Sequence, residues 1–141
     1  MALELLVVLA TTRAPDWSGW NQALWDARVP ASLSRSEDLR RYTGYLPARV
    51  EGRPAGFYFL TESAVDVGVQ YPQLASVALA DPIVWSLSYG PHPAECAAVF
   101  LSAAVLVSRF EGVAFDPQQG IMLSLEQVNE GAQQCLRLMS K

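Results

Sequence analysis

The stretch GPHPAECAAVFLSAAVLVSRFEGVAFDPQQGIMLSLEQVNEGAQQCLRLM, residues 90–139, decides the fold. Its pattern predicts an apolar helix from Pro93, a strand over 112–115, a tight turn over 116–120, a short strand over 121–123 and a final helix. Proline suits a first helical position because the N–H that it lacks would have no partner there. Asp-Pro at the start of the turn and glycine at its end are typical of a tight turn, so the two helices are predicted to enclose a hairpin.

The final helix has the clearest start signal in the chain. Ser124 followed by Gln127 is a capping box, and Leu123 and Val128 are spaced as a hydrophobic staple. Gly131 weakens a helix by about 1 kcal/mol relative to alanine, so we expect a close packing contact there. The predicted buried stripe comprises Val128, Ala132, Cys135, Leu136 and Met139.

The two cysteines, Cys96 and Cys135, fall in the two predicted helices. A disulfide between them requires those helices to pack side by side. Two cysteines in a chain without a recognisable secretion signal are more often buried thiols. We therefore expect both cysteines to be reduced.

The first half of the chain repeats the same order of elements more faintly. Residues 3–11 are a continuous apolar run typical of a covered strand, and helical spacing over 17–28 follows the capping candidates Asp16 and Ser18. Beyond them we expect a polar loop over 29–43 with one helical turn near 37–41, hairpin strands over 45–50 and 55–61, and an irregular or helical piece over 62–75.

A second strand with a clear signal runs from Ile83 to Tyr89, where apolar and polar residues alternate. The period of two places Ile83, Trp85, Leu87 and Tyr89 on the inner face. It places Ser86 and Ser88 on the outer face.

Together these elements predict one α+β domain over residues 1–141. Two similar strand-helix-strand-strand-helix halves form a mainly antiparallel sheet with the helices packed on one face. Half of the residues are hydrophobic and 17% are charged, which is typical of a packed core. The longest nearly apolar stretch, residues 96–107, is shorter than the roughly 18 residues that cross a bilayer, so we expect no membrane segment.

The charge is acidic and unevenly distributed. The net charge is −4 and the pI is near 4.9, which argues against a general nucleic-acid binder that neutralises phosphates. Residues 28–53 carry six basic and three acidic side chains, whereas residues 54–141 carry three basic and eight acidic ones. The acidic part is either a solvated surface or a face that docks on a basic enzyme cleft.

No residue pattern specifies catalysis. The single histidine, His92, lies four residues before Cys96, a spacing that can place a base beside a thiol, but nothing orients it and Cys96 falls in an apolar run. One histidine and two cysteines 39 positions apart match no usual zinc site. We therefore predict no catalytic, cofactor-binding or metal-ligating residue. A hydrolytic pair of carboxylates is a matter of geometry that the sequence does not disclose, and we predict surface positions for the four acidic residues that could form one: Glu62, Asp66, Glu111 and Asp116.

The segment GVAFDPQQG after PAECAAVFLSAAVLVSRF, together with the early WSGWNQALW helix, resembles small proteobacterial α+β immunity proteins of interbacterial, type VI secretion-like toxin systems. The resemblance implies a non-enzymatic cytoplasmic protein that binds one cognate toxin and occludes its active site. An acidic immunity protein would suit a toxin that acts on nucleotides or nucleic acid, because the cleft of such a toxin is basic. The implied partner is a toxin effector domain, with no nucleic acid and no membrane.

Our partner-binding candidates are Trp25, Asp26, Glu62 and Asp66. Trp25 lies about 100° from the stripe that Trp17, Trp20, Leu24 and Ala27 form on a helical wheel, so it is placed at an edge. Tryptophan is enriched among interface hot spots. The alternative is that Trp25 packs under the loop over 29–43.

Two other classes of function remain open. One is a small carboxylate-dependent enzyme or a small-ligand binding domain, with a pocket lined by Tyr45, Tyr58, Trp85 or Tyr89. The other is a structural or regulatory homodimer that pairs through the apolar helix over 93–110, since a helix with so little polar surface needs cover on most sides. The chain is thus expected to be a monomer or a homodimer.

Overall fold

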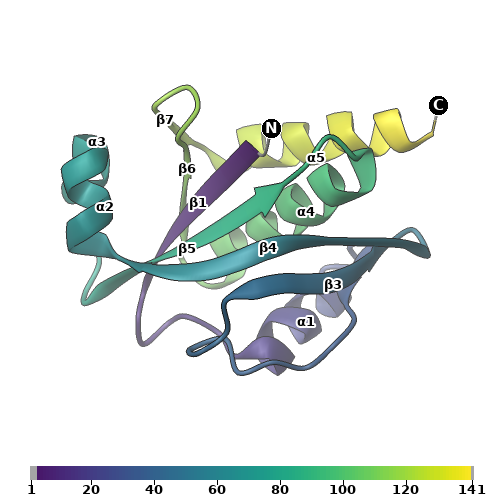
Figure 1. Ribbon diagram of the computed structural model, residues 1–141, viewed down its shortest axis with the longest axis horizontal. Helices are drawn as coiled ribbons and strands as arrows, with labels where there is room; N and C mark the ends of the chain where they lie inside the picture. Colours follow the sequence, from purple (N-terminus) through teal and green to yellow (C-terminus); the bar gives the residue numbers. More distant parts are fainter. Residues whose placement is uncertain (1–2, 141) are drawn as a thin grey trace.

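The computed structural model describes residues 3–140 and shows a seven-stranded antiparallel sheet with five helices in that part of the chain (Figure 1). The strands are ordered β2-β3-β4-β5-β1-β6-β7 across the sheet. In chain order the elements are β1 (Leu3–Ala10), α1 (Trp17–Asp26), β2 (Ala31–Leu33), β3 (Gly44–Val50), β4 (Arg53–Ser63), α2 (Ala64–Gln70), α3 (Pro72–Ala75), β5 (Pro82–Tyr89), α4 (Pro93–Arg109), β6 (Val113–Asp116), β7 (Ile121–Leu123) and α5 (Leu125–Met139). The predicted α+β class is confirmed.

The first strand, β1, lies inside the sheet. It pairs with β5 over its whole length and with β6 on its other side. Every residue from Leu5 to Ala10 is buried. A strand covered on both faces reads as a continuous apolar run, which is the pattern of this segment.

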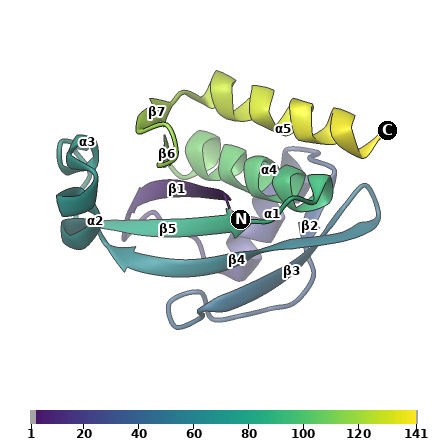
Figure 2. The same cartoon turned by 45° about the horizontal axis from the view of Figure 1, so that its top comes forward.

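Three helices cover one face of the sheet. In Figure 2, α4 lies between the sheet and α5, and α1 lies beside α4 under the same face. Trp20 of α1 is fully buried there between Phe57, Phe59 and Trp85, with ring centroids 5.2 to 6.1 Å apart. Its indole N–H donates to the Ser102 carbonyl of α4 at 3.1 Å, which fixes α1 against α4.

The last helix packs on α4 through the predicted glycine. A Cβ atom at Gly131 would lie 2.7 Å from the ring of Phe100, so only glycine allows this approach. The capping box of Ser124 and Gln127 is present, and Leu136 is the one member of the predicted stripe that is only partly buried. The expected close contact at Gly131 is confirmed.

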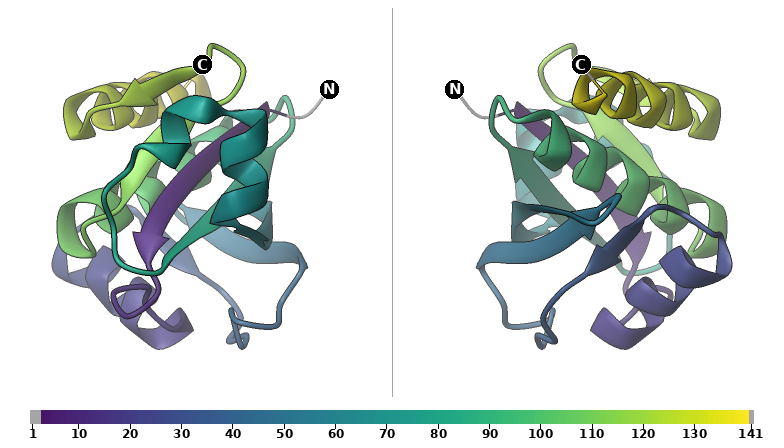
Figure 3. Two further views of the ribbon diagram at one scale, coloured as in Figure 1. Left: turned by 90° about the vertical axis from the view of Figure 1, so that its left-hand side faces the viewer. Right: turned by 90° about the vertical axis from the view of Figure 1, so that its right-hand side faces the viewer.

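The short helices α2 and α3 stand apart from the other three helices (Figure 3) and cover the opposite face of the sheet. Val67 and Leu74 pack there on the apolar side chains Leu6, Val8, Val84 and Phe115. The predicted one-face arrangement therefore holds for α1, α4 and α5 and not for α2 and α3. The physical reason is that β1, β5 and β6 carry apolar residues on both faces, and each face needs cover.

Two further expectations are corrected by pairing between distant residues. The expected loop over 29–43 contains β2, which pairs with β3, and the Leu33 N–H also donates to the Asn21 side chain at 2.8 Å. Ser86 lies on the face opposite Trp85, as expected, but it is buried there, with 1% of its surface exposed. Both outcomes depend on neighbours that the local pattern does not reveal.

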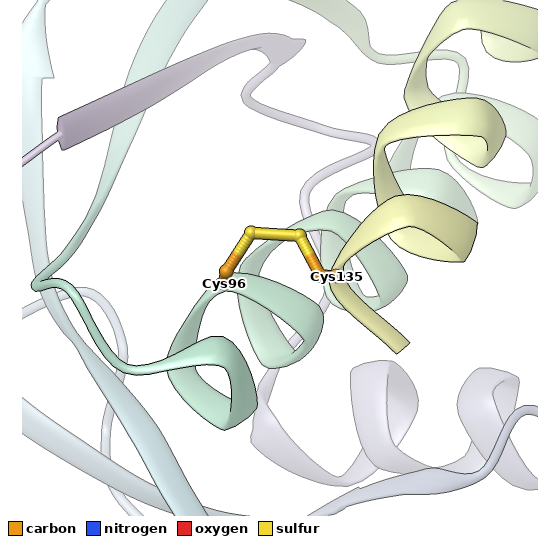
Figure 4. The surroundings of a disulfide bond; sticks show 2 residues. All are labelled: Cys96 and Cys135. Carbon is orange, nitrogen blue, oxygen red and sulfur yellow. A yellow bond between two sulfur atoms is a disulfide. The ribbon is translucent and has the colours of Figure 1, made fainter. Parts of the chain in front are cut away.

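Cys96 and Cys135 form a disulfide between α4 and α5, so the expected reduced thiols are wrong (Figure 4). Their Cα atoms lie 5.7 Å apart, within the usual range for a disulfide. The two helices do pack side by side, which was the geometric condition for the bond. Among residues 3–140, every helix is too short or too polar to cross a bilayer.

Candidate functional site

The candidates Trp25 and Asp26 lie together at the end of α1, on the face that α4 and α5 also cover. The Trp25 side chain is 79% exposed, so the loop over 29–43 does not cover it. Asp26 accepts a hydrogen bond from Gln22 at 2.9 Å. With Asn21 and Arg28 they line a shallow depression of mixed charge.

The other two candidates lie on the opposite side of the sheet. Glu62 is near the end of β4 and half-buried, and Asp66 is exposed in the first turn of α2. A carboxylate in a first helical turn interacts favourably with the helix dipole, which gives Asp66 a local structural role. The structure thus separates the four predicted residues into two pairs on two faces.

The register of the sheet defines the surface around Glu62. Tyr45, Tyr58, Ser88 and Glu4 are opposite one another in successive strands and share one face. Leu60 and Ser86 form the next row, and Glu62 follows on β4. We call this set the open face, because its members other than the buried Ser86 are at least partly exposed: Glu4, Tyr45, Tyr58, Leu60, Glu62, Ser86 and Ser88.

The open face holds two glutamates and no basic residue. Glu4 accepts a hydrogen bond from the Ser86 hydroxyl, which is how the buried serine is satisfied. Burial raises the pKa of the Glu62 carboxyl above its ordinary value, and the negative charge of Glu4 raises it further. Within residues 3–140, no hydrogen bond or ion pair reaches the Glu62 carboxylate, so its charge has no counter-ion in the described chain.

Two tyrosines form the other end of the open face. Tyr58 is 62% exposed and packs edge-on against Tyr45, with ring centroids 5.4 Å apart. The Tyr45 ring crosses β4 at Gly56, where a Cβ would lie 2.5 Å from a backbone oxygen and 2.7 Å from the ring. The Tyr45 hydroxyl donates to Glu95 at 3.2 Å, and burial followed by the charge of Glu95 raises the pKa of this tyrosine. Tyr45 is therefore fixed in place, whereas Tyr58 is available for contact.

A groove of about 840 Å³ lies where α4 begins and α5 ends. Its charged or ionisable lining residues include Arg49, Arg53, His92 and Glu95, and Ser34 and Tyr45 are further polar residues that line it. Arg53 donates to the Met139 carbonyl at 2.8 Å and so ties the β3–β4 hairpin to the end of α5. The groove is thus wide, open and of mixed charge.

The structure settles several chemical alternatives. Because Cys96 is bonded to Cys135, it has no thiol for His92 to activate. Among the suggested pocket residues, Trp85 and Tyr89 belong to the core under α4, while Tyr45 and Tyr58 belong to the opposite face. These four aromatic residues do not line one pocket.

Glu111 and Asp116, two of the four acidic residues that could form a hydrolytic pair, each contact a different partner. Glu111 lies 3.9 Å from Arg13, and the Asp116 carboxylate accepts the Gln118 N–H at 2.9 Å within its own turn. Residues 3–140 contain no group of three or more histidine, cysteine, aspartate or glutamate side chains that could hold a metal ion.

Glu62 is the one partner-binding candidate from the sequence that lies on the open face, while Tyr45 and Tyr58 were expected to line a pocket and Ser86 and Ser88 to face outward. One signal was present: Glu4 is the only charged residue in the apolar run of β1. A charge in a strand of the sheet interior needs a polar neighbour on its own face, and here that neighbour is Ser86. Its identity depends on the β1–β5 pairing.

Fold and site together define a small antiparallel α+β protein with one half of a sheet face left bare. Comparison with known protein families, curated proteins and solved structures finds no significant match to this chain.

Proposed function

We propose that this chain is a non-enzymatic binding protein that neutralises a cognate bacterial toxin by occluding the active site of the toxin. The observation that carries the proposal is the exposure of two large aromatic side chains on regular elements: Trp25 at 79% and Tyr58 at 62%. A large aromatic side chain can bury about 150 to 250 Å² in an interface. Tryptophan and tyrosine are enriched among the few residues that contribute most of the binding free energy. Trp25 precedes Asp26 in the chain, and Tyr58 shares its sheet face with Glu4 and Glu62.

The acidic balance supports a basic partner. With a net charge of −4, the chain is attracted to a positively charged cleft, which speeds association and selects the partner. A cleft that binds nucleotides or nucleic acid has that charge. This is the toxin class that we propose.

The disulfide bears on the compartment in which the partner is met. Cytosolic thiols are kept reduced, so the Cys96–Cys135 bond favours an oxidising compartment over the expected cytoplasm. The two compartments can be distinguished by isolating the protein from cells under acid quench, which traps the redox state of its cysteines, and then titrating its free thiols. An oxidised pair favours an encounter with the toxin in an oxidising compartment, and a reduced pair favours an encounter in the cytoplasm.

The test uses the proteins encoded by the genes next to that of this chain. Each is expressed under an inducible promoter with and without the chain, and growth is measured. We expect one of them to arrest growth, the chain to restore growth, and the two purified proteins to form a stable complex in size-exclusion chromatography. If no flanking gene product is toxic and none binds the chain, the proposed function is wrong.

A second candidate function, small-ligand binding, is favoured by the groove of about 840 Å³. Its volume suits a small molecule, and Arg49, Arg53 and His92 could contact an acidic group. The enzymatic form of this alternative has less support, because Glu95 is the single carboxylate among the residues that line the groove. Ligand-induced shifts in melting temperature across a metabolite set would test it.

A further inference from the structure

We propose that the open face is the surface that docks the partner, and that the docked element is a basic segment carrying arginine or lysine. Tyr58 is the aromatic contact and Glu62 the electrostatic one. The identity of the partner rests on the proposed function. The chemistry of the docked segment does not, because it is argued from the open face alone.

The open face is bare because of where the short helices lie. Val67 and Leu74 cover β1, β5 and β6, and nothing in the described chain covers the same face of β3 and β4. Tyr58 at 62% exposure and the half-buried Leu60 remain accessible there. The surface is therefore an uncovered part of a sheet face whose other part is packed like a core.

The mode of recognition follows from strand pairing. In β4, residues 53–59 pair with β3 and residues 58–63 pair with β5, so Tyr58 is paired on both sides and a partner cannot add as a further strand there. Around Tyr58 the partner is recognised by side chains standing on a rigid sheet, which is a well-ordered platform for a protein surface.

Charge decides the occupant. Glu62 is partly desolvated, is repelled by Glu4 and has no counter-ion among residues 3–140. An approaching guanidinium or ammonium would relieve that repulsion and gain a charge-assisted hydrogen bond. None of the seven open-face residues is basic. Arg49 lies further along the same face of β3, and its guanidinium donates to the Gly52 carbonyl of its own hairpin at 3.0 Å.

The surface around Trp25 lacks this selectivity. Asp26 is already bonded to Gln22, and Arg28 lies in the same depression. A basic segment would meet a cation there as well as a carboxylate. This is why we assign the basic partner to the open face and not to the surface around Trp25.

The first test probes the chemistry directly, with a hexa-arginine peptide at low salt followed by two-dimensional amide NMR. We expect the largest chemical-shift changes at residues 58–62 and 84–88, and the loss of more than half of these changes in Glu62→Gln. The melting temperature of the variant is compared with wild type to confirm folding. The proposal is overturned if the shifts concentrate at the acidic residues of α5 or around Asp26 and leave the open face unchanged.

The second test uses the flanking gene product that binds the chain. Glu62→Lys and Tyr58→Ala should each weaken that complex by about 30-fold or more, as hot-spot losses do. The control is Ile121→Ala, an exposed apolar residue on β7 at the far edge of the sheet, which should change the affinity less than about threefold. A large loss in Trp25→Ala with none in Glu62→Lys and Tyr58→Ala would overturn the docking surface while leaving the proposed function intact. If no flanking product binds wild type, the proposed function fails, and the peptide test still decides the open face. A free protein that dimerises through the open face would also overturn it.

Discussion

Reducing the Cys96–Cys135 disulfide should destabilise the protein strongly. The bond joins the first turn of α4 to the last turns of α5 and closes a chain segment with a sequence separation of 39 residues. Such a cross-link limits the conformations of the unfolded chain, and the conformational entropy that the unfolded chain loses grows with the logarithm of the loop length. For this loop the chain-entropy relation gives an entropy change of about 13 cal/mol/K, or about 4 kcal/mol at 25 °C.

The assay is urea unfolding with and without a thiol reductant. For a slope of roughly 1 to 3 kcal/mol per molar urea, a loss of about 4 kcal/mol lowers the unfolding midpoint by more than about 1 M. The matched control is the double variant Cys96→Ala/Cys135→Ala, whose midpoint should be low and should not respond to the reductant. Alanine is used because Cys135 is buried and a serine hydroxyl would be left without a partner there.

Two results would refute this reasoning. If protein purified without reductant reacts as two free thiols, the bond does not form in solution. If the bond is present but its reduction leaves the midpoint unchanged, the unfolded state is not constrained in the way that the loop length implies. The first result would also remove the argument for an oxidising compartment.

Three further perturbations follow from the structure. Gly131→Ala should destabilise the protein by about 1 to 2 kcal/mol, because the new Cβ would lie 2.7 Å from Phe100. Gly68→Ala should stabilise α2, because alanine favours a helix and the nearest atom, on Ala75, is 3.4 Å away. Urea unfolding of the two variants compares the two effects. Ser124→Ala removes the cap of α5 and should cost about 1 kcal/mol in the same assay, and an unchanged midpoint would contradict it. For Glu62 the folded pKa is raised, so the folded state binds its proton more tightly and stability falls as pH rises above the ordinary value of 4.5. Glu62→Gln should therefore be more stable than wild type at neutral pH and equal to it at acid pH, measured as unfolding midpoints across that range.

Local signals predicted the parts of the fold that depend on near neighbours. The capping box at Ser124 places the start of α5, because the two hydrogen bonds join residues three apart. The apolar run of β1 predicted a covered strand, because burial on both faces needs no partner to be named. Gly131 in a helix marked a close contact, although the contacting residue, Phe100, could not be read from the pattern.

The disulfide and the open face could not be predicted in this way. The Cys96–Cys135 bond needs the packing of α4 on α5, which follows from the whole core. Glu4, Ser86 and Glu62 come from three strands and become neighbours through the order β4-β5-β1 and its register. Strand order is a property of the complete topology, so a single strand's alternation cannot supply it, and the alternation of β5 therefore placed Ser86 in solvent.

The bare part of the sheet has a cause in the sequence after β4. Helix α2 has seven residues and α3 has four, since Pro72 begins a new turn and ends the first helix. Together they are about 16 Å long, which even laid across the strands would cover about three of them. The apolar residues of the second face are confined to that width, on β1, β5 and β6. Outside that width, on β4, the sequence has Tyr58 and Glu62 instead of further apolar core residues or a longer helix to cover them. A surface that binds a basic partner requires such uncovered aromatic and acidic side chains.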